Sequence, residues 1–288
     1  MGRLCTRAAV VITTAAVVAG CSGTTPTVGE GPTADEGPAL TSTSDDMVIE
    51  VSIGGGLVPP HARVTDTLPR IWIAGDGRYL RQTPDAPANQ ALATLQEWRI
   101  PEAALPGLID AARTAGLLED NPDYGKSRIV DAMVTRVIVV SGGFRHEVLV
   151  SALGYPNPGL DDAAMAARTR LSGFLDVLQQ PERIAGVSGP TPYTPTELAV
   201  FVLGTADDST PGTPAVWPLG DLGNAGEPVD WPTNTARCLV LSGDDVAAVT
   251  TAAAGTTVVG PWRAGDGLWA VTLRPLLPDE HSCADVTE

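Results

Sequence analysis

The sequence predicts an α+β fold, in which antiparallel sheets pack against a few helices. β-rich runs flank short glycine turns at 75–77 and 141–143, an arrangement typical of β-hairpins. Two other segments, 101–115 and 161–180, repeat apolar residues at helical spacing. Because the strands come in consecutive runs interrupted by single helices, antiparallel sheets are favoured over a regular alternation of strand and helix.

Residues 1–20 predict a signal peptide for export. Arg3 and Arg7 give a positive start, and the uncharged run that follows has about 12 residues, whereas a membrane-spanning helix needs roughly 20. The run ends at Val18-Ala19-Gly20-Cys21, which resembles the lipobox of bacterial lipoproteins. The resemblance implies cleavage before Cys21 and attachment of acyl chains such as palmitate there, which anchors the chain outside the cell membrane. The alternative is an ordinary secreted protein with a cysteine near the cleavage point by chance.

Residues 21–46 predict the lipidated cysteine followed by a disordered tether. After Cys21 this stretch consists of Ser, Thr, Gly, Pro and acidic residues, with almost no large apolar side chain. Such a composition buries too little apolar surface to offset the entropy lost on ordering. A flexible chain of about 25 residues spans roughly 25–30 Å, so we expect the tether to hold the folded part clear of the lipid.

An N-terminal α+β region is predicted from 47 to 185. Its two helices are 101–115, which ends before Gly116, and 161–180, which Pro181 closes. The apolar stripe of the second helix includes Met165, Leu171, Phe174, Leu175 and Leu178. The predicted strands are 47–53, 70–74, 78–81, 93–100, 129–140 and 144–153.

A C-terminal α+β region is predicted from 186 to 288, with the option that it shares the sheet of the first region. Residues 186–195 read as a linker or surface loop, and 205–235 as a long excursion rich in Pro, Gly and Asp. Ser242, with Asp245 three positions later, fits a capping box that starts a helix. The predicted strands are 198–203, 237–241 and 267–273.

A faint internal repeat gives an alternative description, in which the fold consists of two related strand–helix–strand halves. Apolar positions align at a constant offset of 141 residues: Ile100, Leu105, Leu108 and Ala112 with Leu241, Val246, Val249 and Ala253. Any strand–helix unit produces such coincidences, so common architecture without duplication explains the alignment equally well. The length allows one large domain or two small ones.

Three short motifs resemble those of a group of actinobacterial lipoproteins without an established activity. The motifs are the GGGxVPP run at 54–60, the strand with its GDG turn at 70–78, and AGLL at 115–118. The resemblance covers roughly residues 47–153. It implies the location and the fold, and it carries no catalytic residue across.

The charge of the chain narrows the range of partners. It has 34 acidic and 18 basic residues and a net charge of −16. Such a surface repels nucleic acid and anionic headgroups, so no nucleic-acid partner is expected.

The composition indicates the type of genome. Lys126 is the single lysine beside 17 arginines, and Ala, Gly, Pro and Val are abundant. This bias is typical of the GC-rich genomes of actinobacteria.

The cysteines predict one disulfide. Cys5 leaves with the signal peptide and Cys21 takes the lipid, which leaves Cys238 and Cys283 in an oxidising compartment. Two free buried thiols are the alternative. A metal site needs more ligands than two distant cysteines offer.

No catalytic or metal-binding constellation stands out. The histidines, His61, His146 and His281, lie far apart without metal-ligand spacing, so we expect neither a metal nor a cofactor. Residues 186–189 (GVSG) fall short of a nucleophile elbow. A triad assembled in space stays open, because triads are recognised by geometry rather than by sequence position.

Two tryptophans are the best candidates for contact with a partner. Trp217 and Trp231 lie in the 205–235 excursion, which is too long for a passive connector. Aromatic side chains in irregular loops are frequent in binding surfaces. The alternative is that both rings pack inward and pin the loop to the sheet.

These observations favour a membrane-anchored extracytoplasmic lipoprotein that binds an envelope protein, peptide or glycan without catalysis. One alternative is a hydrolase that acts on an envelope polymer through dispersed carboxylates. Another is an inhibitor or accessory subunit of a different exported protein. Buried acids clustered with a histidine in one cleft would favour the hydrolase, and a flat aromatic loop surface would favour the binding protein.

Overall fold

The computed structural model describes residues 46–56, 58–83, 90–207, 209–233 and 235–287. The predicted signal peptide, Cys21 and all but the last residue of the predicted tether lie outside these residues. Among the described residues, no helix is long and apolar enough to cross a membrane.

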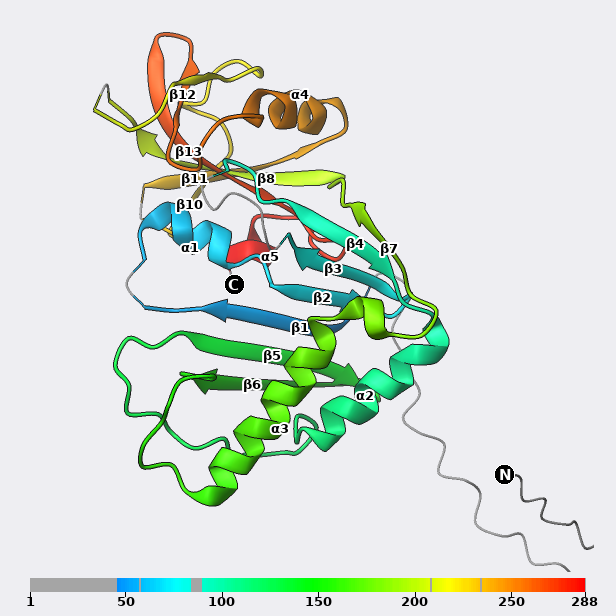
Figure 1. The fold of residues 1–288 in the computed structure, drawn as a ribbon. Coiled ribbons are helices and arrows are strands. Elements are labelled where there is room, and N and C mark those ends of the chain that lie inside the picture. Colours follow the sequence, from blue (N-terminus) through cyan, green and yellow to red (C-terminus); the bar gives the residue numbers. More distant parts are fainter. Residues whose placement is uncertain (1–45, 57, 84–89, 208, 234, 288) are drawn as a thin grey trace, which may run out of the picture. The chain divides into compact units, whose positions relative to one another are not determined.

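The first sheet has seven strands in the order β6-β5-β1-β2-β3-β4-β7, and every neighbouring pair is antiparallel (Figure 1). Its strands are β1 (Met47–Gly54), β2 (Ile71–Ala74), β3 (Arg78–Gln82), β4 (Leu95–Arg99), β5 (Val134–Ser141), β6 (Phe144–Ser151) and β7 (Ser188–Pro192). The last of these comes from the segment predicted as a linker or loop, 186–195. That prediction is wrong for its middle residues, whose prolines hid the strand from a propensity argument.

The second sheet has six strands in the order β10-β11-β8-β13-β12-β9, antiparallel except for the pairing of β12 with β9. Its strands are β8 (Glu197–Thr205), β9 (Ala215–Val216), β10 (Glu227–Val229), β11 (Ala236–Ser242), β12 (Pro261–Ala264) and β13 (Gly267–Pro275). Two antiparallel-dominated sheets with a few helices confirm the predicted α+β class.

Two helices cover one face of the first sheet. They are α2 (Leu105–Thr114), which follows a short 3-10 turn at Glu102–Ala104, and α3 (Asp162–Leu178). Both were expected within a few residues, and the side chain of Asp161 caps α3 by accepting a hydrogen bond from the Ala164 amide at 2.8 Å. Met165, however, is 44% exposed, so its placement in the apolar stripe is wrong. The buried side of α3 begins at Ala164 and continues through Ala167 and Leu171, one position away from Met165.

The strands of the second sheet use their two faces differently. In β8, Leu198, Val200 and Val202 pack with the buried residues of α4 (Asp244–Ala253), whereas Ala199 and Phe201 point to the opposite face. The capping box predicted at Ser242 and Asp245 is wrong. Gly243 takes the N-cap position with φ 60°, and no side chain caps the helix.

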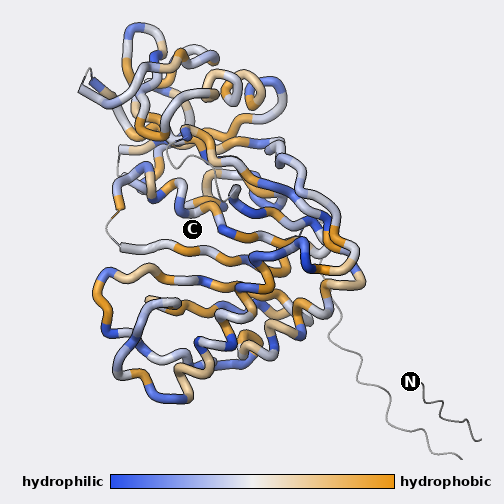
Figure 2. Tube along the Cα trace, in the orientation of Figure 1, coloured by the Kyte–Doolittle hydropathy of each residue, from blue (hydrophilic) through white to orange (hydrophobic). Residues whose placement is uncertain are grey.

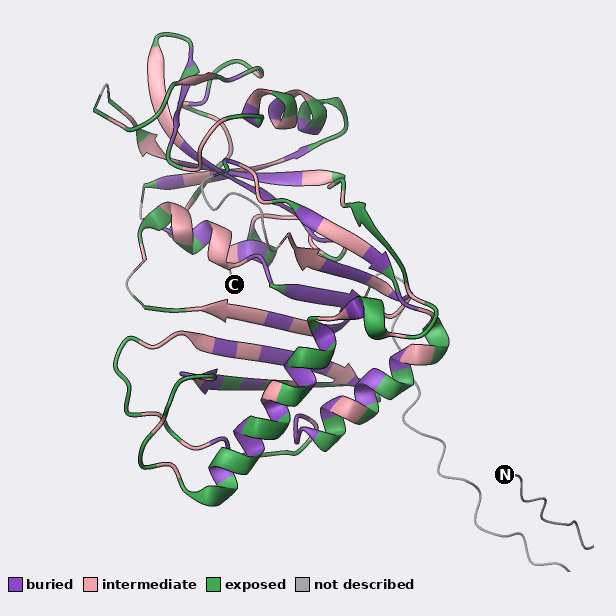
Figure 3. Cartoon of the chain, viewed as in Figure 1, coloured by how far each residue is buried: buried purple, intermediate pink, exposed green. Residues whose placement is uncertain are grey.

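A shared layer fills the space between the two sheets. It consists of α1 (Pro60–Asp66) and the C-terminal segment that ends in α5 (Ala284–Thr287). Val64 of α1 and Val286 of α5 pack on the second sheet, while Leu68 and Leu277 pack on β2, β3 and β4 of the first. Many of the apolar stretches of the two sheets in Figure 2 are buried in Figure 3, with exceptions on the edge strands β6 and β9.

Candidate functional site

A polar cleft of about 440 Å³ opens beside this shared layer, and we call it the central cleft. Its floor is the face of β1, β5 and β6 that α2 and α3 leave uncovered. Its walls are the end of α1, the loop at Trp231, the end of β13 and α5. The residues that line it include Glu50, Asp66, Thr67, Arg136, Trp231, Arg274, Glu280 and Asp285.

An arginine organises the floor of the central cleft. Arg136 of β5 donates to Glu147 of β6 at 2.8 Å and to Glu50 of β1 at 3.3 Å. The hydrogen bond from Arg136 lowers the pKa of Glu147 and raises that of Arg136 itself. Ser52 donates to the same oxygen of Glu50 at 2.9 Å. The charges of the floor are therefore already paired within the chain.

A buried arginine closes the inner wall. Arg274 is 1% exposed and makes a two-point contact with Glu280, at 2.8 Å and 2.5 Å. It also donates to the hydroxyl of Thr67 at 2.8 Å and to its carbonyl at 3.2 Å. Arg274 thereby ties the end of α1 to the last strand, and it has no free charge to offer a ligand.

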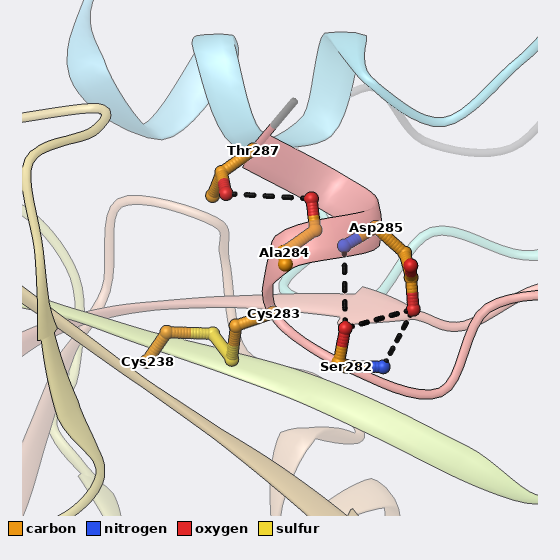
Figure 4. Close-up of a disulfide and its surroundings, with 6 residues drawn as sticks. All are labelled: Cys238, Ser282, Cys283, Ala284, Asp285 and Thr287. Carbon is orange, nitrogen blue, oxygen red and sulfur yellow. Dashed lines mark hydrogen bonds between the residues drawn. A yellow bond between two sulfur atoms is a disulfide. The ribbon is translucent and has the colours of Figure 1, made fainter.

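The outer wall is the C-terminal helix, held by the predicted disulfide. Cys238 of β11 is bonded to Cys283, with the two Cα atoms 6.1 Å apart (Figure 4). Next to it, the carboxylate of Asp285 accepts hydrogen bonds from the amides of His281 and Ser282 and from the Ser282 hydroxyl. These bonds lower the pKa of Asp285, the His281 amide contributing most. The carboxylate of Asp285 is thus also satisfied within the chain.

Asp66 differs from the other three acids of the cleft. It lies at the last position of α1, is half-buried, and makes no hydrogen bond or ion pair among the described residues. Burial raises its pKa, and the nearby charge of Arg70 offsets part of that rise. The central cleft therefore holds one carboxylate that no described residue satisfies.

The predicted contact residue Trp231 lies beside Asp66. It is half-buried, its ring packs edge-on against Phe201 at 5.8 Å, and it lines the central cleft. A second hollow of about 400 Å³ is also lined by Asp66 and Trp231, together with Arg63. Trp231 and Asp66 thus stand where the two hollows meet.

Trp217 lies on the other face of the second sheet. It is 5% exposed, and its ring packs edge-on against the buried Trp262 at 5.6 Å. The structure does not bring it together with Trp231, whose neighbours belong to the cluster on the opposite face. Trp217 is a core residue that pins the 205–235 excursion, and we do not propose it as a contact residue.

The histidines do not form a site in the described part of the chain. His281 lies near the C-terminus, with its Nδ1 3.0 Å from the carboxylate of Glu197. This contact raises the pKa of His281. His146 is on β6 and His61 on α1. Within the described residues, no three His, Cys, Asp or Glu side chains gather as metal ligands.

Sequence reasoning identified Trp231 and missed Asp66, Arg136 and Arg274. One signal for Arg274 was available, because an arginine inside the apolar run 268–277 has to be paired when it is buried. Asp66 gave no signal, since its helix was not predicted. The Pro60 that opens that helix suits a first helical position, which the preceding glycines and proline obscured.

The comparisons with known proteins give no relative. No family model matches the chain, and neither a curated protein nor a solved structure does.

Proposed function

We propose that the chain is a lipid-anchored extracytoplasmic protein of the cell envelope that binds a basic segment of a peptide or protein in the central cleft. The anchor is supported by the export signal that ends at Cys21. The binding function rests on one observation, the half-buried carboxylate of Asp66, which makes no hydrogen bond or ion pair with a described residue and lines the same hollows as the indole of Trp231.

The chemistry of this corner favours a cation. Partial burial raises the pKa of Asp66 and so disfavours its charged form, and a lysine or arginine side chain that enters the cleft favours that form again. The face of an indole attracts the same cation. The net charge of −16 adds a long-range attraction that steers a basic partner towards the protein.

A neutral glycan fits this corner less well. It would stack on Trp231 but leave the charge of Asp66 without a counter-ion. The other acids of the cleft give no further reason for a sugar, because Glu50, Glu280 and Asp285 already have partners within the chain. A basic side chain uses both the carboxylate and the ring.

The binding proposal is tested with two dye-labelled pools of nonapeptides, one with a central lysine and one with a central norleucine. We expect the purified full chain to bind members of the lysine pool and to discriminate against the norleucine pool. Asp66→Asn should weaken binding of the lysine pool roughly 10- to 100-fold, because a charge-assisted hydrogen bond contributes roughly 1.5–3 kcal/mol.

Asp110→Asn is the matched control, since it removes the same charge from an exposed position on α2. Equal loss of binding in the two variants would mean that only the net charge matters, and the cleft assignment would be wrong. Mass spectrometry of the peptides after incubation covers the hydrolase alternative, because cleaved products would contradict a function in binding alone.

The anchor is tested separately. Cys21→Ala should release the protein into the medium or block its maturation, because one lipid-bearing residue carries the whole attachment. Membrane retention that is unchanged in this variant, together with a wild-type mass that lacks lipid, would contradict the lipoprotein assignment.

A further inference from the structure

Sheet edges expose unpaired backbone groups, and three of the four edges of the two described sheets are protected against pairing. β7 contains Pro190 and Pro192, β10 has three residues with Pro228 in the middle, and β9 has two residues. Proline and short length are the usual protections of an edge strand against pairing with another chain.

The fourth edge, β6, has no such protection. It is eight residues long, contains no proline, and pairs with β5 in continuous register from Val134↔Ser151 to Ser141↔Phe144. Among the described residues, no strand pairs with its other side. Figure 3 shows β6 at the margin of the sheet, beyond β5.

The hairpin geometry decides which backbone groups of β6 are free. Ser141 and Phe144 flank a two-residue turn in which Gly142 and Gly143 have φ 59° and 80°, as a type I′ turn requires. Phe144 and every second residue after it therefore exchange hydrogen bonds with β5. The N–H and C=O groups of Arg145, Glu147 and Leu149 point outward.

The side chains along this edge suit a contact. Phe144 is 72% exposed and Leu149 65% exposed, the largest exposures of apolar side chains on either sheet apart from Val216. Between them lie Arg145 and Glu147, on the same face of the strand because they are two positions apart, and within one chain they form an ion pair at 3.1 Å. A partner strand would cover apolar surface and meet one charge of each sign.

We propose that β6 is a self-association edge, at which two copies of this chain pair antiparallel about a two-fold axis at His146. In this register Arg145 lies opposite the partner's Glu147, and Glu147 lies opposite the partner's Arg145. Both residues belong to the set whose backbone groups point outward, so they form hydrogen-bonded pairs, and Phe144 faces the partner's Val148. The contact is isologous, as a two-fold axis demands.

Neighbouring registers are less favourable. Side chains alternate between the two faces of a strand, so the pairing can shift only to registers in which Arg145 lies opposite a partner residue whose side chain is on the same face of the sheet. One such register places Glu147 opposite the partner's Glu147, a like-charge pair. Another places Glu147 opposite the partner's Leu149 and Arg145 opposite the partner's Ser151, so that neither side chain gains a counter-charge from the partner beyond the ion pair of 3.1 Å that the two form within one chain. The register centred on His146 is the one of these that places each of the four charges opposite a counter-charge of the partner.

We expect a weak dimer, because one added strand covers little surface and such interfaces are at the low end of stable association. Arg145→Glu should weaken the dimer about tenfold or more, since each opposite-charge pair becomes a like-charge pair. Glu147→Arg should do the same. An equal mixture of the two variants should restore association, because both ion pairs form again in the mixed dimer.

The test is sedimentation equilibrium of the full chain in detergent, with Cys5 and Cys21 replaced by serine. Melting temperature checks that each variant folds, since either change removes the ion pair between Arg145 and Glu147 within the chain and Glu147→Arg also removes the contact with Arg136. If the parent protein is monomeric at all micromolar concentrations, the proposal is overturned. This result would also be expected if β6 binds a strand of another protein instead of a second copy. A dimer that neither single variant weakens would also overturn it.

A cysteine scan reports the register directly. His146→Cys should form a disulfide-linked dimer under mild oxidation, because residues facing each other in a pair without hydrogen bonds have Cα atoms about 4.5 Å apart. Leu149→Cys is the matched control on the same strand. Its two copies would lie roughly 20 Å apart along the strands, so it should stay monomeric. Equal crosslinking at both positions would contradict this register. Neither outcome depends on binding in the central cleft.

Discussion

Arg274 and Glu280 form a two-point ion pair that joins the last strand of the fold to the segment preceding α5. The same guanidinium reaches Thr67 at the end of α1. One side chain therefore holds together the strand, the helix and the C-terminal segment that form the inner wall of the central cleft.

Removing the acid of this pair should destabilise the protein strongly. Glu280→Ala leaves the guanidinium of Arg274 buried without a counter-charge, which costs about 3–5 kcal/mol. Urea unfolding followed by circular dichroism measures the loss. Asp110→Ala is the control, because it breaks an exposed ion pair with Arg113 on α2 and should cost about 0.5 kcal/mol or less. Similar losses in the two variants would show that burial of Arg274 is not the source of the effect.

Reduction of the disulfide should loosen the outer wall. Cys238 and Cys283 are separated by 45 residues, and closing such a loop stabilises the folded state by about 4 kcal/mol in the chain-entropy model. We expect a Cys238→Ala, Cys283→Ala double variant to lose stability of this order in urea unfolding. Alkylation of the wild type without reductant should find no free thiol at either position, and labelling of both cysteines would contradict the account.

The two tryptophans of the excursion should behave in opposite ways. Trp217→Ala removes a buried ring from the core and should cost about 3–5 kcal/mol without a direct effect on peptide binding. Trp231→Ala should cost less stability, because the ring is half-buried, and should weaken binding of a lysine-centred peptide. Urea unfolding and fluorescence anisotropy measure the two effects. A Trp231→Ala variant that binds normally would remove this residue from the site.

The contact between His281 and Glu197 should depend on pH. The carboxylate raises the pKa of His281 above its usual 6.5, so the folded state holds the proton more tightly than the unfolded state. The stabilisation is complete below the unfolded pKa and is lost as pH rises through the folded pKa. Glu197→Gln should lower the pKa of His281 in an NMR titration, with His61→Gln and His146→Gln variants to assign the signals. An unchanged titration in Glu197→Gln would show that the contact does not form in solution.

Periodicity was sufficient for most of the regular elements. The apolar positions of the faint repeat, from Ile100 to Ala112 and from Leu241 to Ala253, are buried in both halves. The helix pattern and the hairpin glycines each reflect a local property of the chain, the direction of side chains or the sign of φ. Such elements are readable from a single sequence.

The short strands could not be predicted from periodicity. β9, β10 and β12 have two to four residues each, too few for a period to emerge. β12 and β7 contain proline, which argues against a strand unless the residue lies at an edge or a strand end. Their pairing is decided by neighbours distant in sequence, as when β7 adds to β4.

The candidate site was only partly predictable for the same reason. Trp231 could be singled out because tryptophan is rare in a Pro/Gly-rich excursion. Trp217, in the same excursion, is a core residue instead, because the two rings lie on different faces of the second sheet. Asp66 was chosen because its carboxylate makes no hydrogen bond or ion pair with a described residue. Whether a side chain has such a partner depends on the folded structure and cannot be predicted from the sequence alone.

The most direct measurement of the central claim is a double-mutant cycle between Asp66 and the lysine of a bound peptide. Asp66→Asn in the protein is combined with lysine→norleucine in the peptide, and the four dissociation constants are measured by titration calorimetry. If the carboxylate pairs with the lysine, the two changes are non-additive, with a coupling of about 1.5–3 kcal/mol. Additivity within about 0.5 kcal/mol would mean that the two groups do not interact, and the central cleft would not be the site of cation recognition.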